Sequence, residues 1–224
     1  MTHLDIELKQ LKEECIEMFD LVTSQLKKSK SALIHNDQEL AREVNFNERR
    51  VNALELKIDK DCENIFALFN PLAVDLRFVL AVLKINSNLE RIGDIADGIA
   101  RYVAETSAFF DKDLIAVTQI TEMFDIAISM LVDVRASFEA EDTKLSRGIF
   151  KKDDTLDDIN ARANSVVEDF IKTHMDKTGQ CLHIISTIRK LERTGDQVKN
   201  VAEEIIFYIE AKVLKHLSAK AKTE

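Results

Sequence analysis

The sequence has very few residues that interrupt helices. Its 224 residues include one proline, five glycines and no tryptophan, while hydrophobic residues make up 46% and charged residues 32%. Because helix breakers and turn formers are so scarce, this composition predicts an all-helical protein. A chain of this length forms one large domain or two small ones and can bury a core without disulfides or a structural metal.

Positive charge and long apolar segments are also scarce. The chain has 40 acidic against 31 basic residues, a net charge of −9, which argues against a nucleic-acid partner. The longest stretch without a charged side chain, residues 64–74, is only about half of the roughly 20 residues that cross a bilayer. The first residues lack the basic and apolar regions of a signal peptide. We therefore expect a soluble, cytoplasmic protein that meets a membrane only through partners.

Apolar residues recur at intervals of three and four along six segments, as on one face of a helix. The first predicted helix runs to about His35, and the second ends at Asn70-Pro71, where a third begins. Breaks are also predicted near residue 110, at Ser146-Arg-Gly148 and at Thr178-Gly179. Helices of this length predict elongated antiparallel bundles.

One tract occurs twice. Leu89-Glu-Arg-Ile-Gly-Asp94 returns as Leu191-Glu-Arg-Thr-Gly-Asp196, and the fourteen positions from Leu89 contain six identities at an offset of 102 residues. Such self-similarity marks a duplicated structural unit. The sequence therefore predicts two tandem antiparallel three-helix bundles, residues 1–108 and 109–224, which close separate cores or share one.

Each copy of the tract carries two acidic residues four positions apart, so that they project from one side of a helix, one turn apart. The pairs are Glu90 with Asp94 and Glu192 with Asp196. One interpretation is that the acids of this region form ordinary surface ion pairs. The expected pairs are Glu192 with Arg189, Asp196 with Lys199, and Asp97 with Arg101.

The alternative is a metal site completed by facing helices. Oxygen donors at comparable places in the two halves are Glu48 with Asn52, and Asp153 with Asp157, again four residues apart. Hard cations prefer several carboxylate or carbonyl oxygens, and no His or Cys set is clustered with them. This donor set suits iron, manganese or magnesium, or a weakly held zinc ion.

The repeated tract also contains a glycine and an arginine. Gly93 and Gly195 are costly inside a helix, which predicts close helix packing beside the acids or a functional need for exposed backbone. Arg91 and Arg193 are candidates to neutralise the acids or to bind phosphate, although solvated or paired arginines are commoner.

Most of this chain resembles the PhoU family, and the resemblance is strongest in two places. The place in the first half is Pro71-Leu-Ala-Val-Asp-Leu-Arg77 followed by the first tract. The place in the second half is Arg189-Lys-Leu-Glu-Arg-Thr-Gly-Asp196 with Asn200 and Glu203. The resemblance implies two three-helix bundles per chain and a role without catalysis. It also implies binding to the ATPase subunit of the phosphate ABC importer and to a membrane sensor histidine kinase. Members similar to this chain repress the phosphate-starvation response when phosphate is plentiful.

In some members of that family, metal clusters bind to E/D-x-x-x-D motifs. The resemblance extends this role to the acids of both tracts and to the donors on the facing helices, namely Glu90, Asp94, Glu192, Asp196, Glu48, Asn52, Asp153, Asp157 and Asn200. The first half departs from the pattern, since Gly98 and Arg101 stand where the family usually has an asparagine and an acid. Ile95 and Gln197 replace a frequent histidine. We therefore expect the second half to be the first place to hold a metal.

Three functions are compatible with this sequence. The first is a regulatory interaction protein, in which part of the apolar surface forms a homodimer. The second is a carboxylate-bridged metal-binding or di-iron protein without a signalling role. Di-iron sites use Glu-x-x-His, and none of the five histidines has a glutamate three residues before it. The third, a coiled-coil rod, is opposed by the regularly placed breaks.

Overall fold

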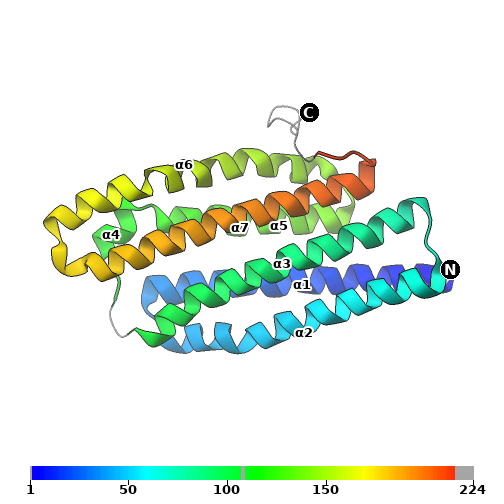
Figure 1. The fold of residues 1–224 in the computed structure, drawn as a ribbon, viewed down its shortest axis with the longest axis horizontal. Helices are drawn as coiled ribbons and strands as arrows, with labels where there is room; N and C mark the ends of the chain where they lie inside the picture. Colours follow the sequence, from blue (N-terminus) through cyan, green and yellow to red (C-terminus); the bar gives the residue numbers. More distant parts are fainter. Residues whose placement is uncertain (1, 107–108, 215–224) are drawn as a thin grey trace.

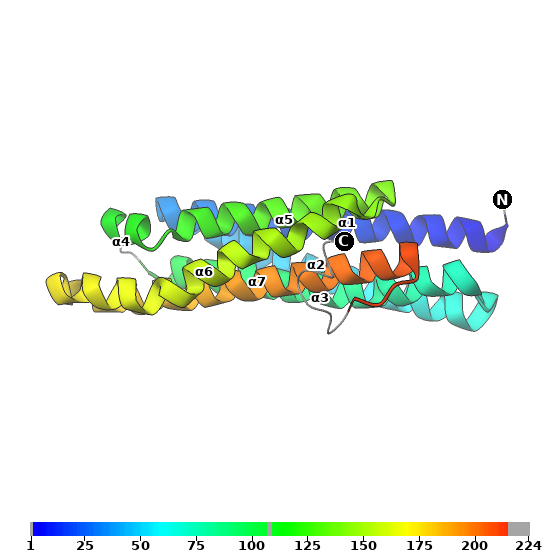
Figure 2. The ribbon, with the colours of Figure 1, turned by 90° about the horizontal axis from the view of Figure 1, so that it is seen from above.

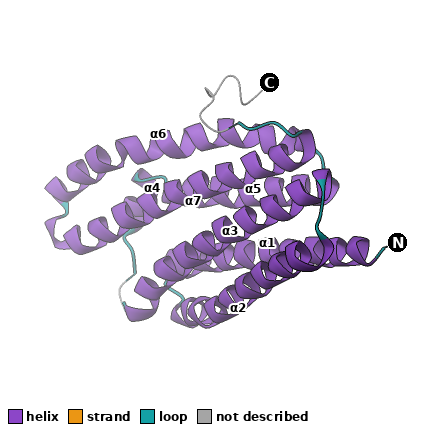
Figure 3. Cartoon of the chain, turned by 45° about the vertical axis from the view of Figure 1, so that its right-hand side comes forward, coloured by secondary structure: helices purple, strands orange, loops and turns teal. Residues whose placement is uncertain are grey.

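The structure, a computed structural model, describes residues 2–106 and 109–214, and their regular elements are all helical (Figures 1 and 3). The prediction of an all-helical fold is confirmed. The helices are α1 (His3–His35), α2 (Gln38–Phe69), α3 (Ala73–Glu105), α4 (Lys112–Val117), α5 (Ile120–Ala140), α6 (Thr143–Thr173) and α7 (Thr178–Glu210), with a 3₁₀ turn η1 (Met175–Lys177). None of the described helices combines the length and the apolarity that a membrane crossing needs.

Two three-helix bundles lie side by side along their length. Helices α1, α2 and α3 pack together, as do α5, α6 and α7, and the bundles meet where α1 contacts α5 and α3 contacts α7 (Figures 1 and 2). Aromatic rings cross this junction: Phe19 lies 5.6 Å from Phe138, and Phe78 lies 5.6 Å from Tyr208, between ring centroids. One continuous apolar core therefore serves both halves.

The turns of the first half follow the sequence signals. Asn36 ends α1 in the left-handed conformation at φ 51°, and the Asp37 side chain accepts a hydrogen bond from the Leu40 amide at 2.9 Å. Asn70 ends α2 in the same conformation at φ 46°. Both residues are asparagines, which tolerate this conformation better than most side chains. The prediction that Pro71 is the first residue of the third helix is wrong, because α3 begins two residues later at Ala73.

The predicted break at Ser146-Arg-Gly148 is wrong, because these residues lie inside α6. The chain turns at Glu141, which has φ 53°, and the Asp142 side chain then accepts a hydrogen bond from the Lys144 amide. Ser146 is buried, and its Oγ lies 2.7 Å from the Oγ of Ser137 on α5. This serine thus joins two helices instead of ending one.

Two further boundaries differ from the prediction. The fourth predicted helix is divided into α4 and α5 at Gln119, which has φ 54°. Thr178 and Gly179 begin α7, and the preceding turn is formed by His174 and η1. Residue 108, the predicted end of the first repeat, lies outside the described residues, so the division at this position stays a prediction.

Candidate functional site

The two repeated glycines allow acidic side chains of a neighbouring helix to lie against the tract. A Cβ atom on Gly93 would lie 2.9 Å from Cγ1 of Val51 and 3.5 Å from Oε2 of Glu48, both on α2. On Gly195 it would lie 2.5 Å from Oδ1 of Asp153 on α6. Distances under 3 Å are closer than van der Waals contact allows. The prediction of close helix packing is confirmed, and it places Glu48 and Asp153 in equivalent positions.

The first acid cluster consists of Glu48 and Asn52 on α2 with Glu90 and Asp94 on α3. Glu48 is only 9% exposed, and within the described part of the chain neither of its buried carboxylate oxygens has a hydrogen-bond partner. Burial, together with the negative charges of Asp94, Asp97 and Glu90, raises the pKa of Glu48 to about 7. Burial and Asp94 also raise the pKa of Glu90. The charge of Arg91 partly offsets this effect on Glu90, but no described cation forms an ion pair with Glu48.

The second acid cluster consists of Asp153 and Asp157 on α6 with Glu192 and Asp196 on α7. Asp153 is 2% exposed and forms an ion pair with Lys199, whose Nζ also lies 2.8 Å from Oδ1 of Asp196. Burial opposes the charge of Lys199, but its hydrogen bonds to both aspartates outweigh this effect and raise its pKa. Burial raises the pKa of Asp153 to about 6 although the ammonium lowers it. A cation that belongs to the chain is thus part of this cluster.

One repeated position causes the difference between the clusters. Position 199 of the second half corresponds to position 97 of the first, and Asp97 stands there. Asp97 forms an ion pair with Arg101 at 2.5 Å and accepts a hydrogen bond from Nδ2 of Asn45 at 2.6 Å. The nearby positive charge of the first half is therefore paired with Asp97 rather than with Glu48.

The ion pairs expected from spacing are formed in part. Asp196 pairs with Lys199 and Asp97 with Arg101, as predicted. The pair of Glu192 with Arg189 is absent from the described residues, and Nη2 of Arg189 lies 3.5 Å from Oδ1 of Asn164 instead.

The remaining predicted donors lie near the surface. Asn52 and Asp157 are exposed, and Asn200 places its Nδ2 3.4 Å from Oδ1 of Asn88 on α3. Within residues 2–106 and 109–214, no three His, Cys, Asp or Glu side chains are gathered as a metal ion would require. The donor types of the first cluster suit a hard cation, because they are oxygens and those of Glu48 have no partner among the described residues, but a cation would have to draw Glu90 and Asp94 closer to Glu48. The second cluster fits less well, since the ammonium of Lys199 already binds its two inner carboxylates.

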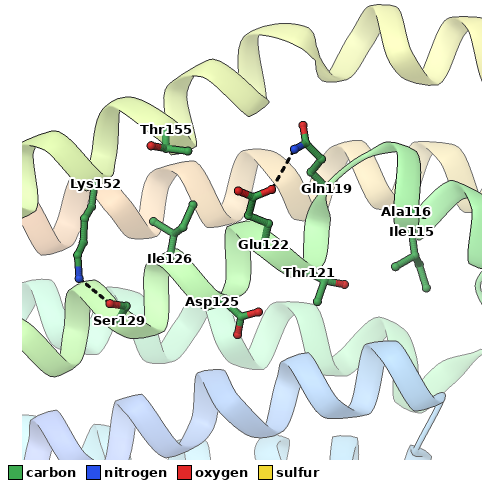
Figure 4. A pocket seen from close by; sticks show the side chains of 10 residues that line it. All are labelled: Ile115, Ala116, Gln119, Thr121, Glu122, Asp125, Ile126, Ser129, Lys152 and Thr155. Carbon is green, nitrogen blue, oxygen red and sulfur yellow. Dashed lines mark hydrogen bonds between the residues drawn. The ribbon is translucent and has the colours of Figure 1, made fainter.

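A separate hollow of about 610 Å³ lies between α4, α5 and α6 (Figure 4). Most of its polar side chains are already paired: Gln119 bonds Glu122 at 2.9 Å, Lys152 bonds Ser129 at 2.5 Å, and Asp125 pairs with Lys30 at 2.5 Å. This hollow therefore offers little free polar chemistry to a ligand.

Comparison with known proteins agrees with the duplicated architecture. The family described as "PhoU domain" matches this chain twice, at residues 15–103 and 120–205. The chain belongs to the PhoU family. A relative from Burkholderia sp, a phosphate-specific transport system accessory protein PhoU homolog, is 32% identical over 97% of this chain and 93% of its own length. A homolog of the same description from Aquifex aeolicus is also 32% identical, over 97% of this chain and 98% of its own length.

Solved structures of PhoU proteins share this fold. The crystal structure of PhoU from Pseudomonas aeruginosa superposes with a TM-score of 0.86 at 27% identity, covering 94% of this chain and all of that one. The phosphate transport system regulatory protein PhoU from Streptococcus pneumoniae gives 0.81 at 25% identity, with 94% and 99% covered. Two tandem PhoU repeats thus form the architecture predicted from the sequence.

Proposed function

We propose that this protein is a non-catalytic regulator of phosphate uptake that acts through protein contacts in the cytoplasm. Its partners are the ATPase subunit of the phosphate ABC importer and a membrane sensor histidine kinase, and it represses the phosphate-starvation response when phosphate is plentiful. The observation that supports this most is the match of both halves to the PhoU family, together with relatives named as accessory proteins of phosphate transport over nearly the full chain. We also propose that the chain forms a homodimer.

Exposed apolar side chains at the turn between α2 and α3 support a role in protein contacts. Leu68 is 74% exposed, Leu72 70% and Val74 58%, all within or beside the Pro71–Arg77 stretch. Grouped apolar side chains on the surface of a soluble protein mark sites of protein interaction. We place one partner-binding surface at this turn.

The test is capture of the purified importer ATPase subunit, and of the cytoplasmic part of the kinase, at high and at limiting phosphate. Leu68→Ser with Leu72→Ser is expected to weaken capture of at least one partner. Leu56→Ser is the matched control, because Leu56 is a 67% exposed leucine elsewhere on α2. A folded protein that captures neither partner at either phosphate concentration contradicts the proposal.

A divalent cation at the first acid cluster forms the second part of the proposal. Glu48, Asn52, Glu90 and Asp94 are the residues that would hold it, and the cation would supply the positive charge that this cluster lacks. Iron, manganese, magnesium and zinc are the candidates, since all of them accept oxygen ligands. The second acid cluster remains a predicted site, in which a metal would have to displace Lys199.

The alternative of a di-iron or metal-storage protein without a signalling role receives no support from the described histidines. His183 stacks on Tyr102 with ring centroids 3.3 Å apart, and His174 stacks on Phe170 at 4.2 Å. Neither residue belongs to an acid cluster. We therefore favour a regulatory role for any bound metal.

A further inference from the structure

The two copies of the tract meet in the seam between α3 and α7. Lys84 pairs with Glu204 at 3.1 Å, and Nδ2 of Asn200 donates to Oδ1 of Asn88 at 3.4 Å, so a step of four residues forward on α3 corresponds to four residues back on α7. The helices therefore run antiparallel, and both views show them adjacent (Figures 1 and 2). Because the repeat offset is 102 residues, this register brings Gly93 level with Gly195. Arg91 on α3 and Arg193 on α7 therefore lie on opposite sides of the seam, near the level of the two glycines.

A hollow of about 340 Å³ lies at this level of the seam. Its lining residues are Arg91, Asp94 and Ile95 of α3 with Lys190, Arg193 and Gln197 of α7. Three cations therefore face one carboxylate, in a chain whose net charge is −9. Neither Arg91 nor Arg193 forms an ion pair or hydrogen bond with another described residue, so both guanidinium groups keep their donors for a ligand.

Lys190 adds a third donor at this hollow. Its Nζ donates to the backbone oxygen of Gly98 at 2.9 Å, which leaves two of its three hydrogens unused. The Lys190 side chain is partly buried, so a bound anion would offset the cost of holding its charge there. Lys190 and Arg193 also line an adjoining hollow of about 440 Å³ together with Arg189, and no acidic residue lines it.

We propose that the seam hollow binds a protonated tetrahedral oxyanion, orthophosphate. The planar guanidinium groups of Arg91 and Arg193 donate paired hydrogen bonds to phosphate oxygens, and the ammonium of Lys190 adds a point charge. Asp94 gives selectivity, because a carboxylate accepts the hydrogen bond of a P–OH group but repels sulfate, which carries no proton. The choice of phosphate among anions rests on the proposed function, whereas the anion site itself rests on the charges and the hollow.

The test is a calorimetric titration of the full-length protein with sodium phosphate, and separately with sodium sulfate, at constant ionic strength. We expect saturable phosphate binding that Arg91→Gln with Arg193→Gln weakens by about tenfold or more. The matched control is Arg49→Gln with Lys60→Gln, which removes two exposed cations of α2 that pair with no described residue and is expected to change the Kd by less than about twofold. Asp94→Asn is expected to reduce the preference for phosphate over sulfate.

Absence of saturable phosphate binding, or equal weakening in the control and seam variants, would overturn this site. Melting temperatures of all variants establish that each one is folded. Capture of the importer subunit and the kinase is measured in parallel with the same proteins. A chain that captures its partners without binding phosphate overturns the seam site alone, whereas one that binds phosphate but captures neither partner contradicts the regulatory function alone.

Discussion

The two acid clusters have the same architecture, but only the second contains a described lysine that pairs with its buried carboxylate. In both, a carboxylate from the middle helix of a bundle packs against the glycine of the repeated tract. In the second cluster Lys199 binds the buried Asp153, whereas the buried Glu48 of the first cluster has no partner among the described residues. The comparison shows that one lysine pairs with the buried carboxylate of the second cluster, whereas no described cation pairs with that of the first.

The largest effect should come from filling the space at the tract glycines. Gly195→Ala places a Cβ 2.5 Å from Asp153 and 2.7 Å from Leu156, and we expect it to lower the free energy of unfolding by about 3 kcal/mol. Gly93→Ala meets mainly a methyl group of Val51, and a loss of about 1 kcal/mol is expected. Urea denaturation measures both.

Gly148→Ala is the control for the glycine variants, because a Cβ there meets nothing within 4 Å inside α6. Higher helix propensity should stabilise this variant by up to about 1 kcal/mol. Equal losses at Gly93 and Gly195 would show that the closer contact of Asp153 with Gly195 adds no packing cost.

Removal of the internal cation should make the second cluster resemble the first. Lys199→Ala leaves Asp153 buried without its ion pair, so we expect a loss of about 2 kcal/mol at pH 8. The folded-state pKa of Asp153 is already raised to about 6 and should rise further in this variant. The charged carboxylate therefore lowers the free energy of unfolding above that pKa, and this effect disappears below the ordinary pKa of 3.8. The loss should therefore shrink towards pH 4. Chemical denaturation at several pH values measures it.

Lys60→Ala is the control for the lysine variant, since Lys60 is exposed and unpaired among the described residues. A loss in Lys199→Ala that is the same at pH 4 and pH 8 would indicate lost packing of the lysine stem. In that case the ion pair would not distinguish the two clusters.

Neutralisation of Glu48 should have the opposite sign. Its pKa is raised from 4.5 to about 7, so the charged carboxylate destabilises the fold above pH 7, and this cost disappears below pH 4.5. Glu48→Gln is therefore expected to stabilise the metal-free protein by about 1 to 2 kcal/mol at pH 8 and by little at pH 4.5. Thermal unfolding at the two pH values tests this, with the exposed Glu63→Gln on α2 as control. Destabilisation at pH 8 would contradict the account of Glu48.

The smallest effect concerns divalent cations. Manganese at about ten times its Kd should stabilise the wild type by about 1.4 kcal/mol, and Glu48→Gln should abolish this shift. Lys199→Ala should add a second response, because the second acid cluster is then open to a cation from solution. Sodium chloride at equal ionic strength is the control. An unchanged manganese response in Glu48→Gln would remove the first cluster as the site.

Local signals account for most of what the sequence predicted correctly. Asn36, Asn70 and Pro71 place the turns of the first half, because they act on their own backbone. Ser146 misled the prediction, since its role is a contact with Ser137 across two helices. Such contacts between helices have no local sequence pattern.

In the candidate site, too, contacts within one helix were predicted and contacts between helices were missed. Spacing along one helix predicted the pair of Asp196 with Lys199, but the bond from Lys199 to Asp153 joins two helices and was missed. The contact of Lys190 with Gly98 depends on the register between the two halves. Only the comparison of positions 97 and 199 within the repeat could have indicated that the clusters differ in charge.

Asp94 belongs to both sides of α3, because its charge acts on Glu48 and its side chain lines the seam hollow. An ion bound on either side changes the field that this one carboxylate presents to the other. Thermodynamic linkage requires that a cation at Glu48 alter phosphate affinity by the same factor as phosphate alters cation affinity. Occupancy of the first half by either ion would then depend on the concentrations of both the metal and phosphate. In the second half, Lys199 already pairs with the acids, so binding there would not depend on the metal concentration.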